Sequence, residues 1–263
     1  SRTTTYVSIA SAIILAIIQG LTEWLPVSSS GHLVLAEKLL NYPSSLTFQV
    51  ALHFGTLMSV FVYFGREITD IIQDLLKLKF KTENGKLGIF IIIATVPAGI
   101  IGFIFKDVFE SIFSNLKIVA IGFAITGLVL IIASLPIAKQ NAKLNYKKAL
   151  IIGTAQILSI FPGISRSGTT ISTGLLSGLK EKTALKFSFL MSIPIIFGAN
   201  ILTIGNQTLP PELIWATLVS FIIGLIILHL LYKYILTNRK NLRYFGIYAL
   251  LLALILGVII IIN

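Results

Sequence analysis

Long apolar blocks separated by short polar loops form the main pattern of the chain. A helix needs roughly 20 apolar residues to cross about 30 Å of hydrocarbon. Six blocks approach that length, namely residues 46–64, 87–105, 116–135, 183–203, 213–232 and 244–262. The pattern therefore predicts an all-α polytopic membrane protein with six transmembrane helices, built as a single membrane domain over residues 1–263.

Two further apolar blocks are too short to span a bilayer, and each runs into a polar turn. They are residues 6–18 and 149–159, followed by the polar stretches 19–32 and 161–170 and by the apolar stubs 33–40 and 171–179. Each pattern predicts two short helices joined by a turn, which is a re-entrant hairpin. A non-helical tip at membrane depth is tolerated only where protein or a wet cavity surrounds it.

The two hairpins share one spacing of residue types. Gln19 precedes Gly31 by 12 positions, and Gln156 precedes Gly168 by the same number. This match predicts an internal duplication, with repeats of approximately residues 1–135 and 146–263.

The basic residues are distributed unevenly among the loops. Of the 21 Lys and Arg residues, 16 lie in loops that share one face if six spans and two re-entrant hairpins are assumed: 65–87, 135–148, 180–186 and 233–243. The positive-inside rule places this face in the cytoplasm and both termini outside the cell. The repeats are then inverted, and their polar tips are expected to meet near the midplane, where inverted repeats place binding sites.

Composition narrows the classes of function. Charged residues make up 12% of the chain, against roughly 25% in soluble domains. The net charge of +11 follows from the loop bias, so nucleic acid is not an expected partner. The chain has no cysteine, which excludes a disulfide framework, a thiolate metal site and a thiol nucleophile.

Glu23 is the only acidic residue of the early apolar region. An ionisable group at membrane depth marks a candidate functional site. Gln19 lies four residues earlier, on the same helix face. Because Mg²⁺ and Ca²⁺ take carboxylate and amide oxygens, Glu23 and Gln19 are candidate ligands of a divalent cation. The alternative is that Glu23 pairs with a structural arginine.

The turn that follows combines three hydroxyls with an imidazole. Ser28, Ser29 and Ser30 precede Gly31 and His32. His32 is a candidate nucleophile or general acid–base, and Ser29 is a candidate nucleophile if a base lies beside it. The serines are also suited to capping a helix N-terminus.

The second turn resembles an anion cradle. Arg166 offers a forked, permanently charged donor that suits phosphate oxygens, and a helix is expected to begin directly after it, with backbone N–H groups that favour anions. Ser165, Ser167 and Thr170 supply neighbouring hydroxyls. We therefore expect phosphate binding here, although Arg166 could also pair with Glu23.

The remaining polar residues of the apolar blocks are assigned to packing. His53 and His229 are expected to pack between helices or to line a cavity. Trp24 and Trp215 are interpreted as anchors at the membrane interface.

In order and spacing, these motifs resemble those of the undecaprenyl-diphosphate phosphatase family of the bacitracin-resistance type. The family's Glu-or-Gln element with a Glu four residues later fits Gln19 and Glu23. Its Pro-Val-Ser-Ser-x-Gly-His element fits residues 26–32, and its Pro-Gly-x-Ser-Arg-Ser-x-x-Thr signature fits residues 162–170. The resemblance covers nearly the whole chain. Many bacterial members have Glu where this chain has Gln19, which removes one anionic ligand.

The resemblance implies hydrolysis of a polyprenyl diphosphate to the monophosphate and phosphate in the cell membrane, for carrier-lipid recycling and cell-wall synthesis. Arg166, Ser165, Ser167 and Thr170, with Ser28 and Ser30, would then hold phosphate. Glu23, with Gln19, would hold Mg²⁺ or Ca²⁺ or orient a nucleophile, and attack by His32, by Ser29 or by water are all left open. The expected partners are the lipid substrate and membrane lipids, and a homodimer is compatible with the sequence.

Three other classes compete with this interpretation. A polyprenyl-phosphate transporter or flippase would also have inverted repeats with broken helices, but transport alone does not require a nucleophile beside a carboxylate. A phosphatidic-acid-phosphatase-type enzyme would need motifs that are missing here in the required order. A non-catalytic scaffold would leave Glu23 and Arg166 unexplained.

Overall fold

The computed structural model describes residues 2–42, 46–204 and 211–262, and every regular element in these ranges is a helix. In chain order the elements are α1 (Arg2–Thr22), α2 (Ser29–Leu40), α3 (Leu46–Tyr63), α4 (Gly65–Leu76), α5 (Glu83–Ile104), α6 (Lys106–Ile112), α7 (Leu116–Ser134), α8 (Tyr146–Ala155), η1 (Gln156–Ile160), α9 (Arg166–Leu176), α10 (Glu181–Ile204), α11 (Pro211–Leu230), η2 (Leu231–Ile235), η3 (Arg239–Asn241) and α12 (Leu242–Ile262). The predicted all-α class is confirmed.

Five stretches of helix among the described residues are long and apolar enough to cross a membrane, and they lie in α5, α7, α10, α11–η2 and η3–α12. A sixth crossing results if α3 and α4 are counted as one span, although an 84° bend separates them. Large apolar side chains such as Leu251, Leu254 and Ile255 of α12 are about half exposed. Such a surface suits contact with lipid tails, so the chain is a multi-pass membrane protein.

Both predicted hairpins contain two helices joined by a turn: α1 with α2, and α8–η1 with α9. The expectation of a short first helix over residues 6–18 was wrong, because α1 continues to Thr22. Gln19 extends the buried stripe of Ala12, Leu15 and Ala16, with the i, i+3, i+4, i+7 spacing of one helix face. Packing of this buried face therefore keeps Gln19 within the helix.

The second helices of the two hairpins begin with the same cap. The Ser28 hydroxyl accepts from the backbone N–H of Gly31, and the Ser165 hydroxyl accepts from that of Gly168. These serines are 137 positions apart, as are the glycines and also Gln19 and Gln156. The shared cap is what a duplication would produce, and the duplication, the boundaries of the repeats and their inverted orientation stay predictions.

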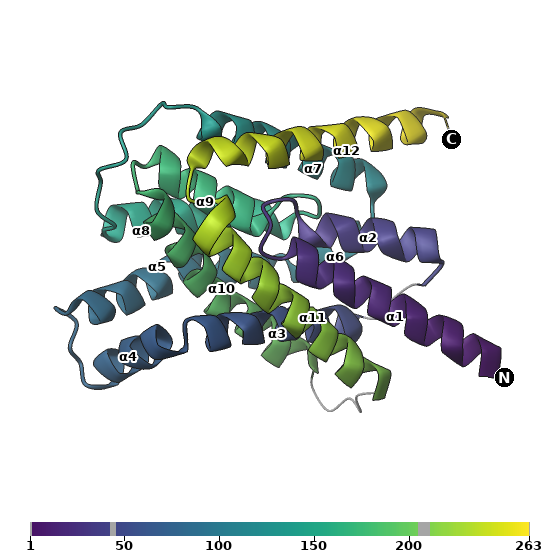
Figure 1. The fold of residues 1–263 in the computed structure, drawn as a ribbon, viewed down its shortest axis with the longest axis horizontal. Helices are drawn as coiled ribbons and strands as arrows, with labels where there is room; N and C mark the ends of the chain where they lie inside the picture. The colour runs from purple at the N-terminus through teal and green to yellow at the C-terminus, as the bar shows by residue number, and fades with distance from the viewer. Residues whose placement is uncertain (1, 43–45, 205–210, 263) are drawn as a thin grey trace.

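The long helices pack in pairs around the hairpins, with α7 on α12, α3 on α11, α1 on α11 and α5 on α8. In Figure 1 both chain termini lie at the right, the C-terminus above the N-terminus, whereas the α4–α5 turn and the α7–α8 connection lie at the left. The termini therefore share one end of the molecule, opposite two of the basic loops.

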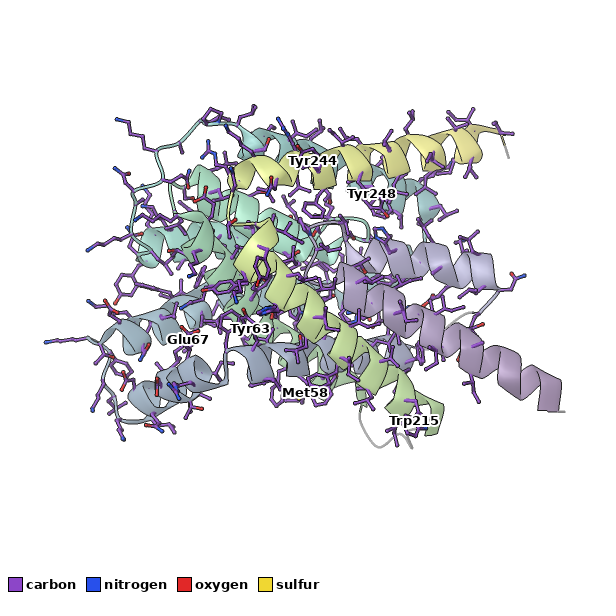
Figure 2. The ribbon with its side chains drawn as sticks, in the orientation of Figure 1. Met58, Tyr63, Glu67, Trp215, Tyr244 and Tyr248 are labelled. Atoms are coloured by element: carbon purple, nitrogen blue, oxygen red, sulfur yellow. The ribbon has the colours of Figure 1, made fainter. Side chains whose placement is uncertain are left out.

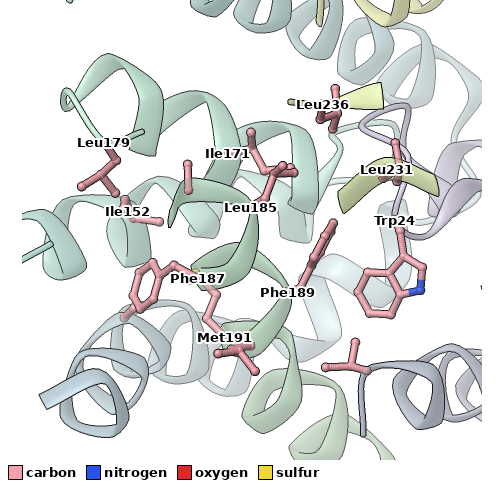
Figure 3. Packing of buried hydrophobic residues seen from close by; sticks show 14 of the residues in the cluster. Trp24, Ile152, Ile171, Leu179, Leu185, Phe187, Phe189, Met191, Leu231 and Leu236 are labelled. Carbon is pink, nitrogen blue, oxygen red and sulfur yellow. The ribbon is translucent and has the colours of Figure 1, made fainter. Parts of the chain in front are cut away.

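The interpretation of Trp24 as an interface anchor was wrong. Its side chain is fully buried and contacts the ring of Phe189 edge-on, with centroids 5.5 Å apart (Figure 3). The indole N–H donates to Ser59 Oγ at 3.0 Å. Burial of a large ring whose N–H has a partner stabilises a core, and this core holds the first turn in place. Trp215, by contrast, is 63% exposed near the start of α11 (Figure 2).

Candidate active site

The second turn is fixed to α7 by backbone geometry. Gly163 has φ +89°, a conformation that side chains disfavour. The Thr126 hydroxyl of α7 donates to the Gly163 carbonyl at 2.9 Å and accepts from the Ser165 N–H at 3.0 Å. The residue before Arg166 is thereby anchored on a long helix.

The two turns contact each other, as the sequence predicts. The Ser30 hydroxyl accepts from the Gly163 N–H at 3.4 Å, and the Ser167 hydroxyl donates to the Leu25 carbonyl at 3.2 Å. This contact brings residues that are about 140 positions apart into one site.

The Glu23 carboxylate lies at the centre of this site. Its side chain is 5% exposed, and Oε1 accepts from Arg166 Nη2 at 2.7 Å. Oε2 accepts from the Ser29 hydroxyl at 2.6 Å and from Gln19 Nε2 at 2.9 Å. A buried charge persists only when it is paired and hydrogen-bonded, and here both oxygens are. His53 Nε2 lies 3.5 Å from Oε2.

Arg166 keeps an unpaired donor after it pairs with Glu23. Its Nη1 is buried and has no hydrogen-bond partner among the described residues. The guanidinium carbon lies 5.6 Å above the Trp24 ring, which adds a cation–π contact. One side of the guanidinium is therefore held in place, and the other is free to bind an anion.

A cavity of about 490 Å³ opens beside this pair. Most of its polar lining comes from the two turns and from α3 and η1, and most of its apolar lining comes from α5 and α10. The polar lining includes Glu23, Ser28, Ser29, Ser30, Gln49, His53, Gln156, Ser159, Ser165, Arg166 and Asn200. The apolar lining includes Ala98, Phe103, Ile160, Pro194 and Ile196. Such a cavity suits a ligand with a polar head and an apolar body.

Several predicted site residues lie beside the cavity without lining it. Ser167 is bonded to the first turn. The Thr170 hydroxyl forms a 2.6 Å hydrogen bond with Ser188 Oγ, and Gln19 lies behind Glu23. These groups hold the wall of the site together, and their direct contact with a phosphate stays a prediction.

His32 lies on the other side of the first turn. Its Nδ1 donates to the Ser28 carbonyl at 2.7 Å, and its Nε2 lies 2.7 Å from the Tyr248 hydroxyl of α12. The ring stacks on Tyr248, which is labelled in Figure 2, and meets Phe123 edge-on. The structure thus places His32 outside the cavity lining, and its catalytic role stays a prediction.

Several cavity residues were not among the predicted site residues, and His53, Gln156 and Asn200 are three of them. Each is a polar residue in an apolar block, which is the signal that singled out Glu23. Gln156 also occupies the repeat position of Gln19, so the duplication could have identified it.

The oxygens near Glu23 fit a divalent cation only in part. Gln19 Oε1 is buried and has no partner among the described residues, so one neutral oxygen is free. No group of three or more His, Asp or Glu residues is gathered in the part of the chain that the structure describes. Mg²⁺ commonly binds through one or two carboxylates together with phosphate oxygens of the substrate, and this donor set matches that mode.

Known proteins with similar sequences cover almost the whole chain. The family model described as bacitracin resistance protein BacA matches residues 12–255. An undecaprenyl-diphosphatase of Thermosipho melanesiensis is 44% identical, with 92% of this chain and 96% of that protein covered. Proteins of the same name from Korarchaeum cryptofilum and Methanococcus vannielii are 42% and 38% identical, with 94% and 92% of this chain and 97% and 96% of their own lengths covered. The chain belongs to the BacA family.

Proposed function

We propose that this protein is a membrane phosphatase that hydrolyses undecaprenyl diphosphate to the monophosphate and inorganic phosphate. The observation that carries the proposal is the contact of one carboxylate, Glu23, with both a hydroxyl and a guanidinium in the wall of an amphipathic cavity. The names of the similar proteins support the same reaction. They give no support to the alternative of a transporter.

Ser29 is the proposed nucleophile. Its hydroxyl already donates to Glu23 Oε2 at 2.6 Å, so the carboxylate is placed to take the proton as the oxygen attacks. Ser29 Oγ would bond to the terminal phosphorus while the bond from that phosphorus to the bridging oxygen breaks, releasing the lipid monophosphate. Water would then attack the phosphoserine, release inorganic phosphate and restore the hydroxyl.

Arg166 is the proposed phosphate anchor. Phosphoryl transfer depends mainly on positioning and charge neutralisation. Arg166 lines the cavity, and its Nη1 is a charged donor without a partner among the described residues. Ser165, Ser28 and Ser30 line the same wall and would bind further oxygens. Glu23 fixes the guanidinium through Nη2, so Arg166 is oriented before the substrate arrives.

The apolar wall is the proposed contact for the lipid. Residues of α5 and α10 line it, including Ala98, Phe103 and Ile196. Burial of isoprenoid carbon against these helices adds binding free energy in proportion to the area removed from water. A diphosphate at the turns would thus have its chain directed between α5 and α10.

A divalent cation, Mg²⁺ or Ca²⁺, is the proposed cofactor, with Glu23 and Gln19 Oε1 as the residues that would contact it. Bound there, the ion would neutralise charge on the diphosphate.

We further propose that both hairpins are re-entrant, that the repeats are inverted and that both termini lie outside the cell, on the basis of the bias of the basic loops.

Phosphate release tests this function directly. The purified protein in detergent would be given undecaprenyl diphosphate with Mg²⁺, with Ca²⁺ and with chelator, beside Arg166→Ala. We expect metal-dependent release that the variant loses. A folded wild-type protein that releases no phosphate with any of several prenyl lengths or metals would contradict the proposal and favour lipid transport.

A further inference from the structure

The Gln156 side chain is buried without internal partners. It is 1% exposed, and neither Nε2 nor Oε1 has a hydrogen-bond partner among the described residues. It also lines the cavity that holds Arg166 and Ser29. Native proteins satisfy nearly all buried polar groups, and leaving one unpaired is destabilising. A primary amide with both ends free therefore points to a ligand.

Gln156 differs from Gln19, its counterpart in the first hairpin, in its hydrogen-bond partners. In the first hairpin, Gln19 Nε2 donates to Glu23 at 2.9 Å and to Thr56 at 3.3 Å. In the second hairpin the residue at the position of Glu23 is Ile160. The Gln residue recurs, but its carboxylate partner does not.

The next helix shows the same replacement. If Phe187 of α10 is aligned with Phe48 of α3, Ile195 takes the position of Thr56. Both internal partners of Gln19 are thus isoleucines in the second repeat, and both isoleucines line the cavity. The Gln156 amide thus has no partner among the described residues, although the residue lines the cavity.

The backbone around Gln156 holds the side chain at this wall. The chain changes from α8 to the 3₁₀ turn η1 at this residue, and the Ser159 hydroxyl donates to the Gln156 carbonyl at 2.6 Å. Just before it, α8 lies against α5 so closely that a Cβ on Gly153 would be 2.3 Å from the Ala94 carbonyl oxygen. This contact fixes α8, which leads into Gln156, against α5, which also lines the cavity.

The unpaired groups of the cavity indicate what it binds. Arg166 Nη1 and Gln156 Nε2 are free donors, and both residues line the same space. Donors that converge in a cavity suit an anion with several oxygens, and a diphosphate has that chemistry. An uncharged amide can donate to a phosphate oxygen without neutralising its charge, so it would add to binding of the diphosphate while Arg166 supplies the positive charge.

We propose that Gln156 is a substrate-binding residue whose Nε2 donates to a phosphate oxygen of the bound diphosphate, beside the oxygen held by Arg166. Oε1 then accepts from a protonated phosphate oxygen or from water bound to it. This inference rests on the proposed phosphatase function, since it names a further group in the same site. It assigns the amide to binding and not to the displacement step.

The test compares Gln156→Met, which keeps the length of the side chain and removes its hydrogen bonds, with Gln140→Met as the matched control. Gln140 is partly buried outside the cavity lining, and its Nε2 donates to the carbonyls of Ala138 and Leu175. Steady-state kinetics with undecaprenyl diphosphate would be measured beside thermal unfolding in detergent. Unfolding would be followed without ligand, with inorganic pyrophosphate and with inorganic phosphate.

We expect Gln156→Met to raise KM about tenfold, the effect of one lost hydrogen bond to a charged group, with kcat within about threefold of wild type. Its Tm without ligand should equal or exceed that of wild type, because no internal hydrogen bond is lost. Gln140→Met should lower Tm and leave KM unchanged. Gln156→Glu should bind substrate more weakly than the Met variant, because its charge repels phosphate.

The unfolding measurements with pyrophosphate and with phosphate distinguish binding of a diphosphate from binding of phosphate in general. They also separate the Gln156 inference from the phosphatase proposal. A smaller pyrophosphate shift in Gln156→Met, with the phosphate shift unchanged, assigns the amide to the diphosphate. Loss of both shifts assigns it to phosphate in general. If the wild type releases no phosphate, the phosphatase proposal fails, and a pyrophosphate shift that needs Gln156 still supports the subsite. A KM within twofold of wild type, together with undiminished shifts, overturns the inference.

Discussion

The hydroxyl of Ser29 and the carboxylate of Glu23 lie 2.6 Å apart, although Glu23 directly follows α1 and Ser29 begins α2. Arg166, from the second turn, holds the other oxygen of the same carboxylate at 2.7 Å. One carboxylate thus contacts both the proposed nucleophile and the proposed phosphate anchor. The two hairpins have to dock on each other for this arrangement to form.

Replacement of Ser29 by Ala should lower kcat at least a thousandfold, because it removes the attacking oxygen and the proton that Glu23 takes. Ser30→Ala is the matched control. Its hydroxyl pairs with Ser28 Oγ and accepts from Gly163 N–H, so we expect a loss of about tenfold or less. Phosphate release measures both variants, and acid quench during turnover should trap phosphoserine in the wild type and in Ser30→Ala but not in Ser29→Ala.

A Ser29→Ala variant with activity within tenfold of wild type would contradict the role of Ser29. Attack by water, with Glu23 as the base, would then be the better description. Equal losses in the two variants would instead indicate a general disturbance of the turn.

Replacement of Arg166 by Met should destabilise the protein by about 3 kcal/mol, because removing one partner of a buried pair leaves the other charge unpaired. The two side chains are 12% and 5% exposed. Adding Glu23→Gln removes the unpaired charge, so the double variant should be more stable than Arg166→Met while staying inactive. Thermal unfolding in detergent, beside phosphate release, measures this order. A double variant as unstable as the single one would show that the pair is not coupled.

The sequence predicted the helices and the turns from local signals, namely the lengths of the apolar blocks and the positions of glycine and serine. It predicted the meeting of the turns from the charge bias of the loops, through the inverted topology that this bias implies. It could not predict that α1 would continue through Gln19. That outcome depends on burial against other helices, and tertiary packing overrides the local polarity of a residue. The full burial of Trp24 has the same origin, since its partners Ser59 and Phe189 lie on α3 and α10.

The candidate site was predictable only in its residue types. Glu23, Ser29 and Arg166 were identified because polar groups are costly in apolar surroundings. The role of each residue depends on which oxygen of the Glu23 carboxylate accepts from Ser29 and which accepts from Arg166. The docking of two turns about 140 residues apart determines these contacts. His53 gave the same kind of signal but has no neighbouring motif, and Gln156 was noted only for its repeat spacing, so neither was assigned to the site.

His32 allows a test between catalysis and positioning. Its Nδ1 donates to the Ser28 carbonyl at 2.7 Å, which braces the turn that carries Ser29. Asn has an amide N–H near the position of Nδ1, so His32→Asn should keep activity within about tenfold of wild type. His32→Ala should lose more, on the order of 100-fold, through a loosened turn. Tyr248→Phe should change activity little.

Inactive His32→Asn and His32→Ala variants with unchanged thermal stability would favour the catalytic role that the sequence suggests. The comparison is informative because both variants remove the imidazole, and only one keeps the bond to Ser28.

The orientation in the membrane can be tested with single cysteines, because the chain has none of its own. Lys79, in the basic α4–α5 turn, and Lys117, at the start of α7, are both exposed. We expect Lys117→Cys to react with an impermeant maleimide in intact cells and Lys79→Cys to react only after permeabilisation. The reverse pattern would contradict extracytoplasmic termini.

Gly31 lies where the first hairpin meets α7 and the second turn. A Cβ there would lie 2.5 Å from Phe123 Cζ and 3.1 Å from Gly163 Cα. Gly31→Ala should destabilise the protein by about 1–3 kcal/mol through overpacking and lower kcat by shifting the turn that holds Ser29. Gly257→Ala on α12 is the control, because its Cβ meets nothing within 4 Å, and Ala should stabilise the helix by about 0.5–1 kcal/mol. Phe123→Leu makes room for the new methyl group, so adding it to Gly31→Ala should recover part of the lost activity and Tm. If the Gly31→Ala variant has wild-type kcat and Tm, the close contact between the turns is not required for the site.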